Sequence, residues 1–315
     1  MATKFEPQQL LDFRLYLGAK RSRKRVHSAI AMCKCAMSVA CGSMNRFELK
    51  VKTMKKLLVL SIAALVVLSF ESAVWAQGEW GNLKGRIKVE GTVPAAPAEE
   101  IDKDQAICMK DGVKPLDDNL VVDKEGYLRD VFVMMLLKPG SDPKVHPSYE
   151  EKKTKELVLD NVNCRFVPHA IVVRTGQKLT LKNSDDVGHN CHIVTMKNEE
   201  NVNLAQHGSV DVTLKSADKT PGNVVCDIHK WMDAVVLVRD EPYAAVTDEH
   251  GNFVIENLPA GKWTFQFWHK KGGYLSGLTV GKEKTGKRGE VEIEIKNGET
   301  FDFGQLLVPA ANLNK

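Results

Sequence analysis

The sequence lacks the features that mark several common protein classes. Its longest apolar run covers about fourteen residues, 57–70, whereas a membrane-spanning helix needs about twenty. Beyond Gly81 no segment shows helical periodicity for more than about a turn, which argues against an α/β fold.

No nucleophile elbow or phosphate loop is present. Asp185 and Asp186 are adjacent, so their side chains diverge on an extended chain, and we interpret them as a turn rather than an acid/base pair. We therefore expect a protein that is not an enzyme.

A basic surface is also missing from most of the chain. The net charge of +4 comes from the front, because residues 1–76 carry 13 of the 44 Lys and Arg but only 4 of the 40 Asp and Glu. Residues 77–315 are therefore net negative by about five charges. Binding to a phosphate backbone requires a basic face, so we exclude nucleic acid as the partner.

A secretory signal peptide is predicted at residues 54–76. Its charged region is Met54-Lys55-Lys56, its apolar region is 57–70, and its small-residue region is Ala73-Val74-Trp75-Ala76. Cleavage would leave a mature chain that begins at Gln77, lies in the periplasm or is otherwise exported, and has no stable membrane span. An uncleaved membrane anchor is the alternative.

Residues 1–53 precede this signal, although signal peptides belong at the N-terminus. We interpret them as the product of a start codon assigned too early, or as a disordered basic extension. The functional alternatives are a nucleic-acid arm at Lys20–Arg25 and a metal clip at Cys33 and Cys35, close to Cys41. No partner motif supports either alternative.

Strand patterns dominate from Gly81 onward. Residues 86–90 alternate between apolar and polar side chains, and residues 130–137 form a continuous apolar run of the kind found in buried strands. Further strand patterns occupy 156–159, two segments that turn at Thr175-Gly176, 209–214, 223–226 and 234–238. This arrangement predicts an all-β sandwich.

The stretch from Cys226 to Met232 brings together side chains that bind soft metals. The sequence Cys226-Asp-Ile-His229-Lys-Trp-Met232 places a thiolate, an imidazole and a thioether within seven residues. Two His and one Cys in a trigonal set, with a weak axial Met, form a blue-copper site. His189, at the head of an alternating run that ends at Val194, offers the second imidazole.

This order of residues, a His-Asn pair followed by Cys-x-x-His-x-x-Met, resembles the cupredoxins, the small blue-copper proteins of electron transfer. The short spacing from Cys to Met is similar to that of amicyanin. The resemblance implies His189, Cys226, His229 and Met232 as ligands of one type 1 copper per chain. It also implies that Asn190 ties the two ligand loops together.

The resemblance implies a Greek-key β-sandwich with an N-terminal β extension over residues 77–240. It implies a one-electron carrier that cycles copper between Cu(II) and Cu(I) and exchanges electrons with redox proteins such as cytochromes or a periplasmic dehydrogenase. Cupredoxins generally pass electrons through a hydrophobic surface around the residue equivalent to His229. Trp231 would either shape that surface or be buried against the second domain.

Other interpretations of the same residues stay open. Cys226 and His229 could be a fragment of a zinc site, although no second ligand pair follows Met232. Cys226 could belong to a disulfide, and Met232 could be plain core packing. The functional alternatives are copper binding for storage, delivery or sensing, and a metal-free structural or adhesive protein of the cell envelope.

A second pattern starts after residue 240. Two tight turns, at 248–251 and 259–261, separate three alternating strands within residues 243–269. This pattern resembles the carboxypeptidase-regulatory-like modules, small β-sandwiches related in fold to transthyretin. We predict such a module over residues 241–310, with its remaining strands at 289–295 and 299–307.

The remaining cysteines suggest one disulfide. In an oxidising compartment we favour Cys108 with Cys164, which leaves Cys191 free and buried, but pairing of Cys191 with either stays open.

Four further histidines, His169, His192, His207 and His269, are candidate extra ligands. His192 lies three residues after His189 and so faces the other side of a strand, where we interpret it as structural. We interpret the other three as surface or sheet-capping residues.

Overall fold

The computed structural model describes residues 79–280 and 283–313, which all lie in the compact unit Ser69–Lys315. These residues are mostly strands arranged in several sheets, which confirms the predicted all-β sandwich class. The predicted signal peptide, the membrane anchor and the interpretation of residues 1–53 lie outside the described residues. In the described part of the chain, no helix is both long and apolar enough to cross a membrane.

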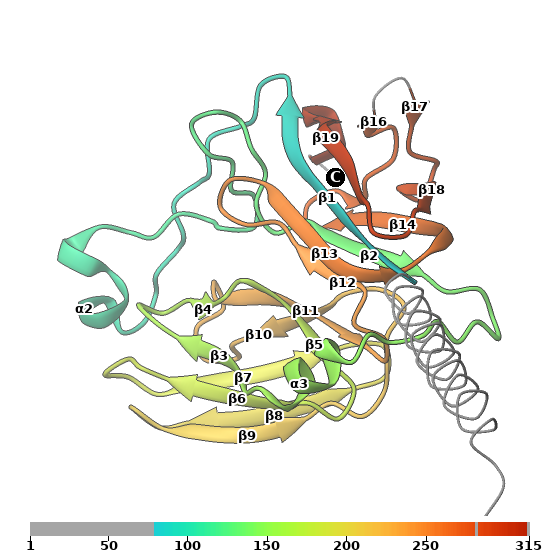
Figure 1. Cartoon of the computed structure of the whole chain (residues 1–315). Helices are drawn as coiled ribbons and strands as arrows, with labels where there is room; N and C mark the ends of the chain where they lie inside the picture. Colours follow the sequence, from blue (N-terminus) through green and yellow to red (C-terminus); the bar gives the residue numbers. More distant parts are fainter. Residues whose placement is uncertain (1–78, 281–282, 314–315) are drawn as a thin grey trace, which may run out of the picture. The chain divides into compact units, whose positions relative to one another are not determined.

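One sandwich carries the predicted metal ligands (Figure 1). Its two sheets have the strand orders β5-β11-β10-β7-β8 and β4-β3-β6-β9. The strands are β3 (Leu157–Asn161), β4 (Phe166–Val167), β5 (Ala170–Arg174), β6 (Lys178–Asn183), β7 (His189–Val194), β8 (Glu199–Leu204), β9 (Ser209–Thr213), β10 (Gly222–Val225) and β11 (Asp233–Arg239). Most neighbours are antiparallel, but β3 runs parallel to β6 and β5 parallel to β11.

Alternation along these strands explains their packing. In β6, Leu179 and Leu181 are fully buried in the core between the sheets, and in β7 Cys191 and Ile193 point into the same core. The predicted turn between β5 and β6 has Gly176 at φ 78°, a left-handed conformation that glycine adopts without a steric penalty.

The structure confirms the favoured pairing of the cysteines. A disulfide joins Cys108 to Cys164, while Cys191 and Cys226 are free and buried. Cys226 is therefore available as a ligand. Cys108 ends the short helix α2 (Gln105–Cys108), so the disulfide attaches the segment that precedes the sandwich to its core.

The second sandwich combines strands from both ends of the described chain. Its sheets have the orders β13-β1-β19-β16-β17 and β12-β2-β14-β15, with β18 paired to β14. The strands are β1 (Trp80–Glu90), β2 (Phe132–Leu136), β12 (Ala244–Val246), β13 (Asn252–Pro259), β14 (Gly261–His269), β15 (Gly273–Tyr274), β16 (Thr279–Val280), β17 (Glu283–Lys284), β18 (Glu290–Ile295) and β19 (Thr300–Pro309). The remaining short helices are η1 (Lys110–Gly112), α3 (Ser148–Thr154) and η2 (Ala310–Leu313).

Sheet pairing divides the strands differently from the predicted boundary at residues 240 and 241. Strand β1 pairs with β13 and β19, and β2 pairs with β12 and β14, so both belong with the later strands. Leu83 and Ile87 of β1 are fully buried against Phe253 and Phe303. The sequence pattern of residues 241–310 does not reveal this pairing, because β1 and β19 are about two hundred residues apart. Whether either sandwich folds as a separate domain stays a prediction.

Two strands are buried on both faces and connect the cores. In β2, Val133 and Met135 enter the core of the second sandwich, whereas Phe132 and Met134 face a separate cluster. In β11, the alternate residues Val235 and Leu237 join that same cluster. Burial on both faces explains why these two strands are continuous apolar runs in the sequence.

His169, the residue just before β5, lies in an ionic network rather than at the surface, so its interpretation as a surface residue was wrong. The side chain is 4 % exposed, and its Nδ1 lies 2.9 Å from the Asp130 carboxylate. Its Nε2 lies 3.4 Å from Asp233 and 3.9 Å from Asp118. The buried His269 lies near the same network, and its pKa is lowered to about 4 because burial penalises the charged ring.

Cations also surround this network. Arg129 pairs with Asp130, Arg165 with Asp118 and Lys270 with Asp233. Burial by itself would lower the pKa of His169, but hydrogen bonds to Asp130 and Asp233 outweigh it and raise the pKa to about 9.

The raised pKa makes the contribution of His169 to stability depend on pH. Protonated His169 stabilises the fold fully below about pH 6.5, and this contribution is lost as the pH rises through about 9. We expect His169→Gln to lower the free energy of unfolding more at pH 6 than at pH 9, by on the order of 2 kcal/mol. Urea unfolding of both proteins across this range measures the difference.

The matched control is His207→Gln, because the side chain of His207 is 62 % exposed and, within residues 79–280 and 283–313, pairs only with the exposed Asp186. The free energy of unfolding of the His207→Gln protein should equal that of the wild type at every pH. A His169→Gln penalty that does not change between pH 6 and pH 9 would contradict the network as described.

Candidate metal centre

Two loops at one end of the first sandwich bring the predicted ligands together. His189 is the first residue of β7, and the loop between β10 and β11 carries Cys226, His229 and Met232. Strands β7 and β10 are antiparallel neighbours with Val225 opposite His192, so the beginning of β7 and the end of β10 meet. The pairing of β10 with β7 therefore places Cys226 beside the His189 end of β7.

Three possible metal-donor atoms, from His189, His229 and Cys226, lie close together in the buried interior. The Nδ1 atoms of His189 and His229 lie 3.0 Å apart, and Nδ1 of His229 lies 3.8 Å from Sγ of Cys226. The ligand atoms of these three residues all lie within 4.8 Å of one another. The residues are only 1 %, 0 % and 2 % exposed for His189, His229 and Cys226. Water is thus excluded from the point at which the donors meet.

The outer nitrogens of both rings are held by carboxylates. Nε2 of His189 lies 2.8 Å from Oδ2 of Asp185, and Nε2 of His229 lies 2.8 Å from Oδ2 of Asp104. An ionised carboxylate only accepts, so each Nε2 donates its proton, and the two Nδ1 atoms are the ring nitrogens that face each other and Cys226. Metal-ligating histidines almost always make such an outer hydrogen bond.

Met232 closes the same loop. Its side chain is in the core that contains Cys226, and the residue is 1 % exposed. The Cys226 amide donates to the Met232 carbonyl at 3.1 Å, and the Met232 amide donates to the His229 carbonyl at 2.9 Å. These two backbone bonds make a tight turn that holds Met232 in the same loop as Cys226 and His229.

Asn190 ties the two loops together. Its Oδ1 accepts a hydrogen bond of 3.1 Å from the Asp227 amide, the residue after Cys226. The backbone amide of Asn190 donates to Sγ of Cys226 at 3.3 Å, and the backbone amide of His229 donates to the same sulfur at 3.4 Å. Both donors favour the thiolate form of Cys226. The structure thus gives Asn190 the place that the resemblance implied.

The electrostatics of the cluster favour a thiolate at Cys226 beside a protonated His189 ring. Burial would raise the pKa of Cys226, but hydrogen bonds with His189 and His229 outweigh it and lower the pKa to about 6. Burial would lower the pKa of His189, but Asp185 and then Cys226 raise it to about 9. Cys191 lacks such partners, and burial raises its pKa to about 12. Cys226 is therefore the residue suited to bind a cation.

Several neighbours of the cluster were not predicted. Asp185 is not a simple turn residue, since its carboxylate also accepts hydrogen bonds from the amides of Asn163 and Cys164, at 2.6 and 2.8 Å. No sequence pattern indicated that Asp104 contacts the site, because it lies 125 residues from His229 in the chain. Trp231 is 8 % exposed and its ring centre lies 5.0 Å from that of His229, within the core of the first sandwich.

The other histidines lie apart from this centre. His192, on the other side of β7, pairs with Asp227 at 3.3 Å, as a residue facing away from the core would. His269 is 1 % exposed, so its interpretation as a surface residue was wrong, but it ends β14 and its Nδ1 accepts a hydrogen bond of 3.2 Å from the Lys271 amide, as a sheet-capping residue would.

Two other groups of donor residues do not make comparable centres. In the group of Cys164, Asp185 and His189, the sulfur is already in the disulfide. In the group of Asp118, His169 and Asp233, the carboxylates are already paired with cationic side chains.

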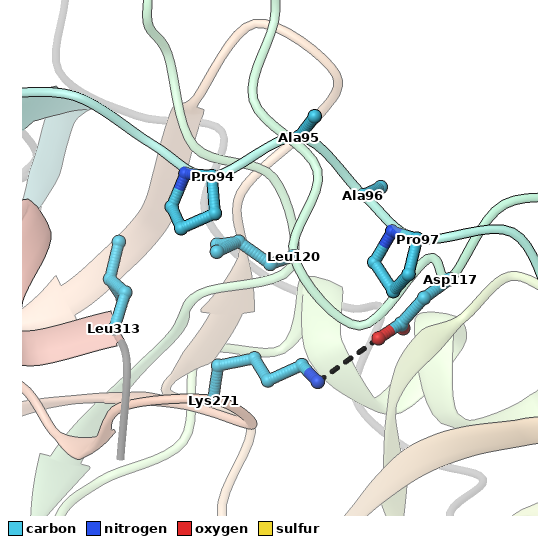
Figure 2. Close-up of a pocket in the computed structure, with 8 residues that line it drawn as sticks. All are labelled: Pro94, Ala95, Ala96, Pro97, Asp117, Leu120, Lys271 and Leu313. Atoms are coloured by element: carbon cyan, nitrogen blue, oxygen red, sulfur yellow. Dashed lines mark hydrogen bonds and ion pairs between the residues drawn. The ribbon is translucent and has the colours of Figure 1, made fainter.

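A pocket in the second sandwich is also separate from the metal centre. Figure 2 shows the segment 94–97 facing Leu120 and Leu313, with Lys271 reaching Asp117 at 3.0 Å. None of the predicted ligands lines this pocket. It therefore offers no route to the converging donor atoms.

No protein-family model and no curated protein matches this chain. Among solved structures, a reduced Cu(I) form of an amicyanin variant is 20 % identical, with a TM-score of 0.24 over 34 % of this chain and 98 % of that one. A purple cupredoxin from Nitrosopumilus maritimus is 18 % identical, with a TM-score of 0.23 over 26 % and 97 %.

A copper-containing nitrite reductase from Thermus scotoductus SA-01 is 14 % identical, with a TM-score of 0.24 over 39 % of this chain and 27 % of that chain. The structural neighbours named here are thus cupredoxin proteins, similar to about a third of the chain. At these values the likeness carries no argument about function. The case for a metal rests on the side chains of this protein.

We expect Asp185→Asn to destabilise the metal-free protein by about 2 kcal/mol, because the amide nitrogen of asparagine would face donors that now bind a carboxylate. Urea unfolding measures this loss. The matched control is Asp186→Asn, whose side chain is 74 % exposed and should change stability little. Equal effects of the two substitutions would show that the Asp185 hydrogen bonds are not important for folding.

Proposed function

We propose that this chain binds one type 1 copper through His189, Cys226, His229 and Met232 and acts as a one-electron carrier. The supporting observation is the convergence of two Nδ1 atoms and one sulfur in a buried interior. A thiolate with two imidazoles and a nearby thioether is the donor set of blue-copper sites. Structural zinc sites are instead closed by four Cys or His ligands.

Copper would supply one-electron chemistry by alternating between Cu(II) and Cu(I). The protein supplies fixed positions for the donors. Asp185 and Asp104 hold the two rings, Asn190 joins the loops, and the amides of Asn190 and His229 orient the sulfur. Ligands that are already held in place change little between two metal charge states, which favours fast electron exchange.

Export and redox partners complete the proposal. The predicted signal peptide at residues 54–76 and the Cys108–Cys164 disulfide both suit an oxidising compartment such as the periplasm. A carrier in that compartment would exchange electrons with other redox proteins, such as cytochromes or a dehydrogenase. In this proposal the chain itself is not an enzyme.

The visible absorption spectrum tests the proposed site. We expect residues 77–315, exported and loaded with Cu(II), to show an intense blue thiolate-to-copper band at one copper per chain. Cys226→Ser should abolish the band because it removes the sulfur ligand, whereas Cys191→Ser should retain it. A folded protein that binds no copper would contradict the proposal and favour a metal-free structural or adhesive role.

A reversible one-electron potential separates electron transfer from copper storage or delivery. An electron carrier should show a single reversible wave with no loss of metal on repeated cycling. Loss of copper on reduction would instead favour storage, delivery or sensing.

A further inference from the structure

The segment before the first sandwich lies over the ligand loop. Ile101 is 4 % exposed and belongs to the core that contains Cys226 and Trp231. Lys103 donates from Nζ to the Ile228 carbonyl at 3.4 Å. Five residues further on, Cys108 is joined to the sandwich by the disulfide. The residues between 101 and 108 are therefore attached at both ends beside the metal centre.

Asp104 occupies an unusual position within this segment. It is the N-cap residue of α2, where an aspartate normally accepts a hydrogen bond from the first helical turn. Here its side chain makes no such bond, and its backbone has φ 47° and ψ 35°, a left-handed conformation that aspartate adopts more readily than most residues other than glycine. The carboxylate lies instead 2.8 Å from Nε2 of His229.

The disulfide connects the two carboxylates that hold the two rings. On one side, the Cys108 amide donates to the Asp104 carbonyl at 2.9 Å. On the other side, the Cys164 amide donates to the Asp185 carboxylate at 2.8 Å. A single cross-link therefore fixes the supports of both His189 and His229.

Asp104 also covers the outer edge of His229. The side chain of His229 is 0 % exposed, whereas that of Asp104 is 41 % exposed. The molecular surface above the ring is thus a carboxylate and not an imidazole. A negative charge at this distance from a ligand stabilises the higher charge state of a bound metal.

We propose that Asp104 is a positioning residue for His229, which fixes the orientation of the ring through Nε2 and favours the oxidised state of the proposed copper. The second part rests on the proposed function, but the first part does not require a metal. The missing helix cap supports a specific role, since the Asp104 carboxylate bonds His229 in place of the first turn of α2.

The first experiment uses the metal-free protein. The Nε2 proton of His229 should exchange slowly with water in the wild type, as observed by imidazole NMR, because it is buried and bonded. We expect Asp104→Ala to accelerate this exchange at least tenfold. Asp104→Asn should keep it slow, because the amide oxygen still accepts. The His189 Nε2 proton, bonded to Asp185, is the internal reference.

The matched control is Asp102→Ala, because Asp102 is an exposed aspartate in the same segment with no hydrogen bond or ion pair among the described residues. It should leave the exchange of both ring protons unchanged. If Asp104→Ala also leaves the His229 exchange rate unchanged while the protein stays folded, Asp104 does not position the ring and the inference fails.

The second experiment measures the reduction potential of the copper-loaded protein. Asp104→Ala and Asp104→Asn both remove the charge, and both should raise the ratio of Cu(I) to Cu(II) affinity about tenfold, which equals about 59 mV for one electron. An unchanged potential in both variants would overturn the electrostatic role. A wild type that takes up no copper would defeat the proposed function, while the exchange rates would still decide whether Asp104 positions His229.

Discussion

The close contact between Nδ1 of His189 and Nδ1 of His229, 3.0 Å apart, is the constraint on which the site depends. With both Nε2 atoms donating to carboxylates, the Nδ1 atoms of His189 and His229 face one another, and the sulfur of Cys226 lies beside them. Polar atoms in a buried interior need partners, so these three atoms must share protons or bind a cation. Hydrogen bonds with Asp185, Asp104 and Asn190 hold the three atoms in this arrangement.

The two-sandwich construction supports this geometry. The ligand loop runs directly into β11, whose inner face lies in the core with Cys226 and whose outer face packs against β2 of the second sandwich. A strand buried on both faces cannot shift without disturbing two cores. Just after Met232, Asp233 takes part in the ionic network with His169, which links the loop to the residues flanking β2 and β14. The second sandwich thus acts as a support for the end of the ligand loop.

Short-range patterns predicted much of this structure because their physical causes are local. Alternation identified β6 and β7, since side chains on a strand point to opposite faces. The continuous apolar run at β2 indicated a buried strand. The spacing of Cys226, His229 and Met232 identified the candidate loop, because one turn brings these residues together. His169 was misinterpreted, since its charged partners come from three separate segments and no local pattern records them.

The sequence by itself determined the all-β class and the candidate donors, because these follow from residue types and from spacings within a strand or a loop, whereas the pairing of Cys108 with Cys164, 56 residues apart, was settled only by the tertiary structure. Tertiary structure decided that β1 completes the later sheet and that Asp104 and Asp185 hold the two rings. Hydrogen bonds between residues more than a hundred positions apart, such as that between Asp104 and His229, depend on how strands pair and loops close. No local pattern encodes such contacts, since the chain must fold before the two side chains meet.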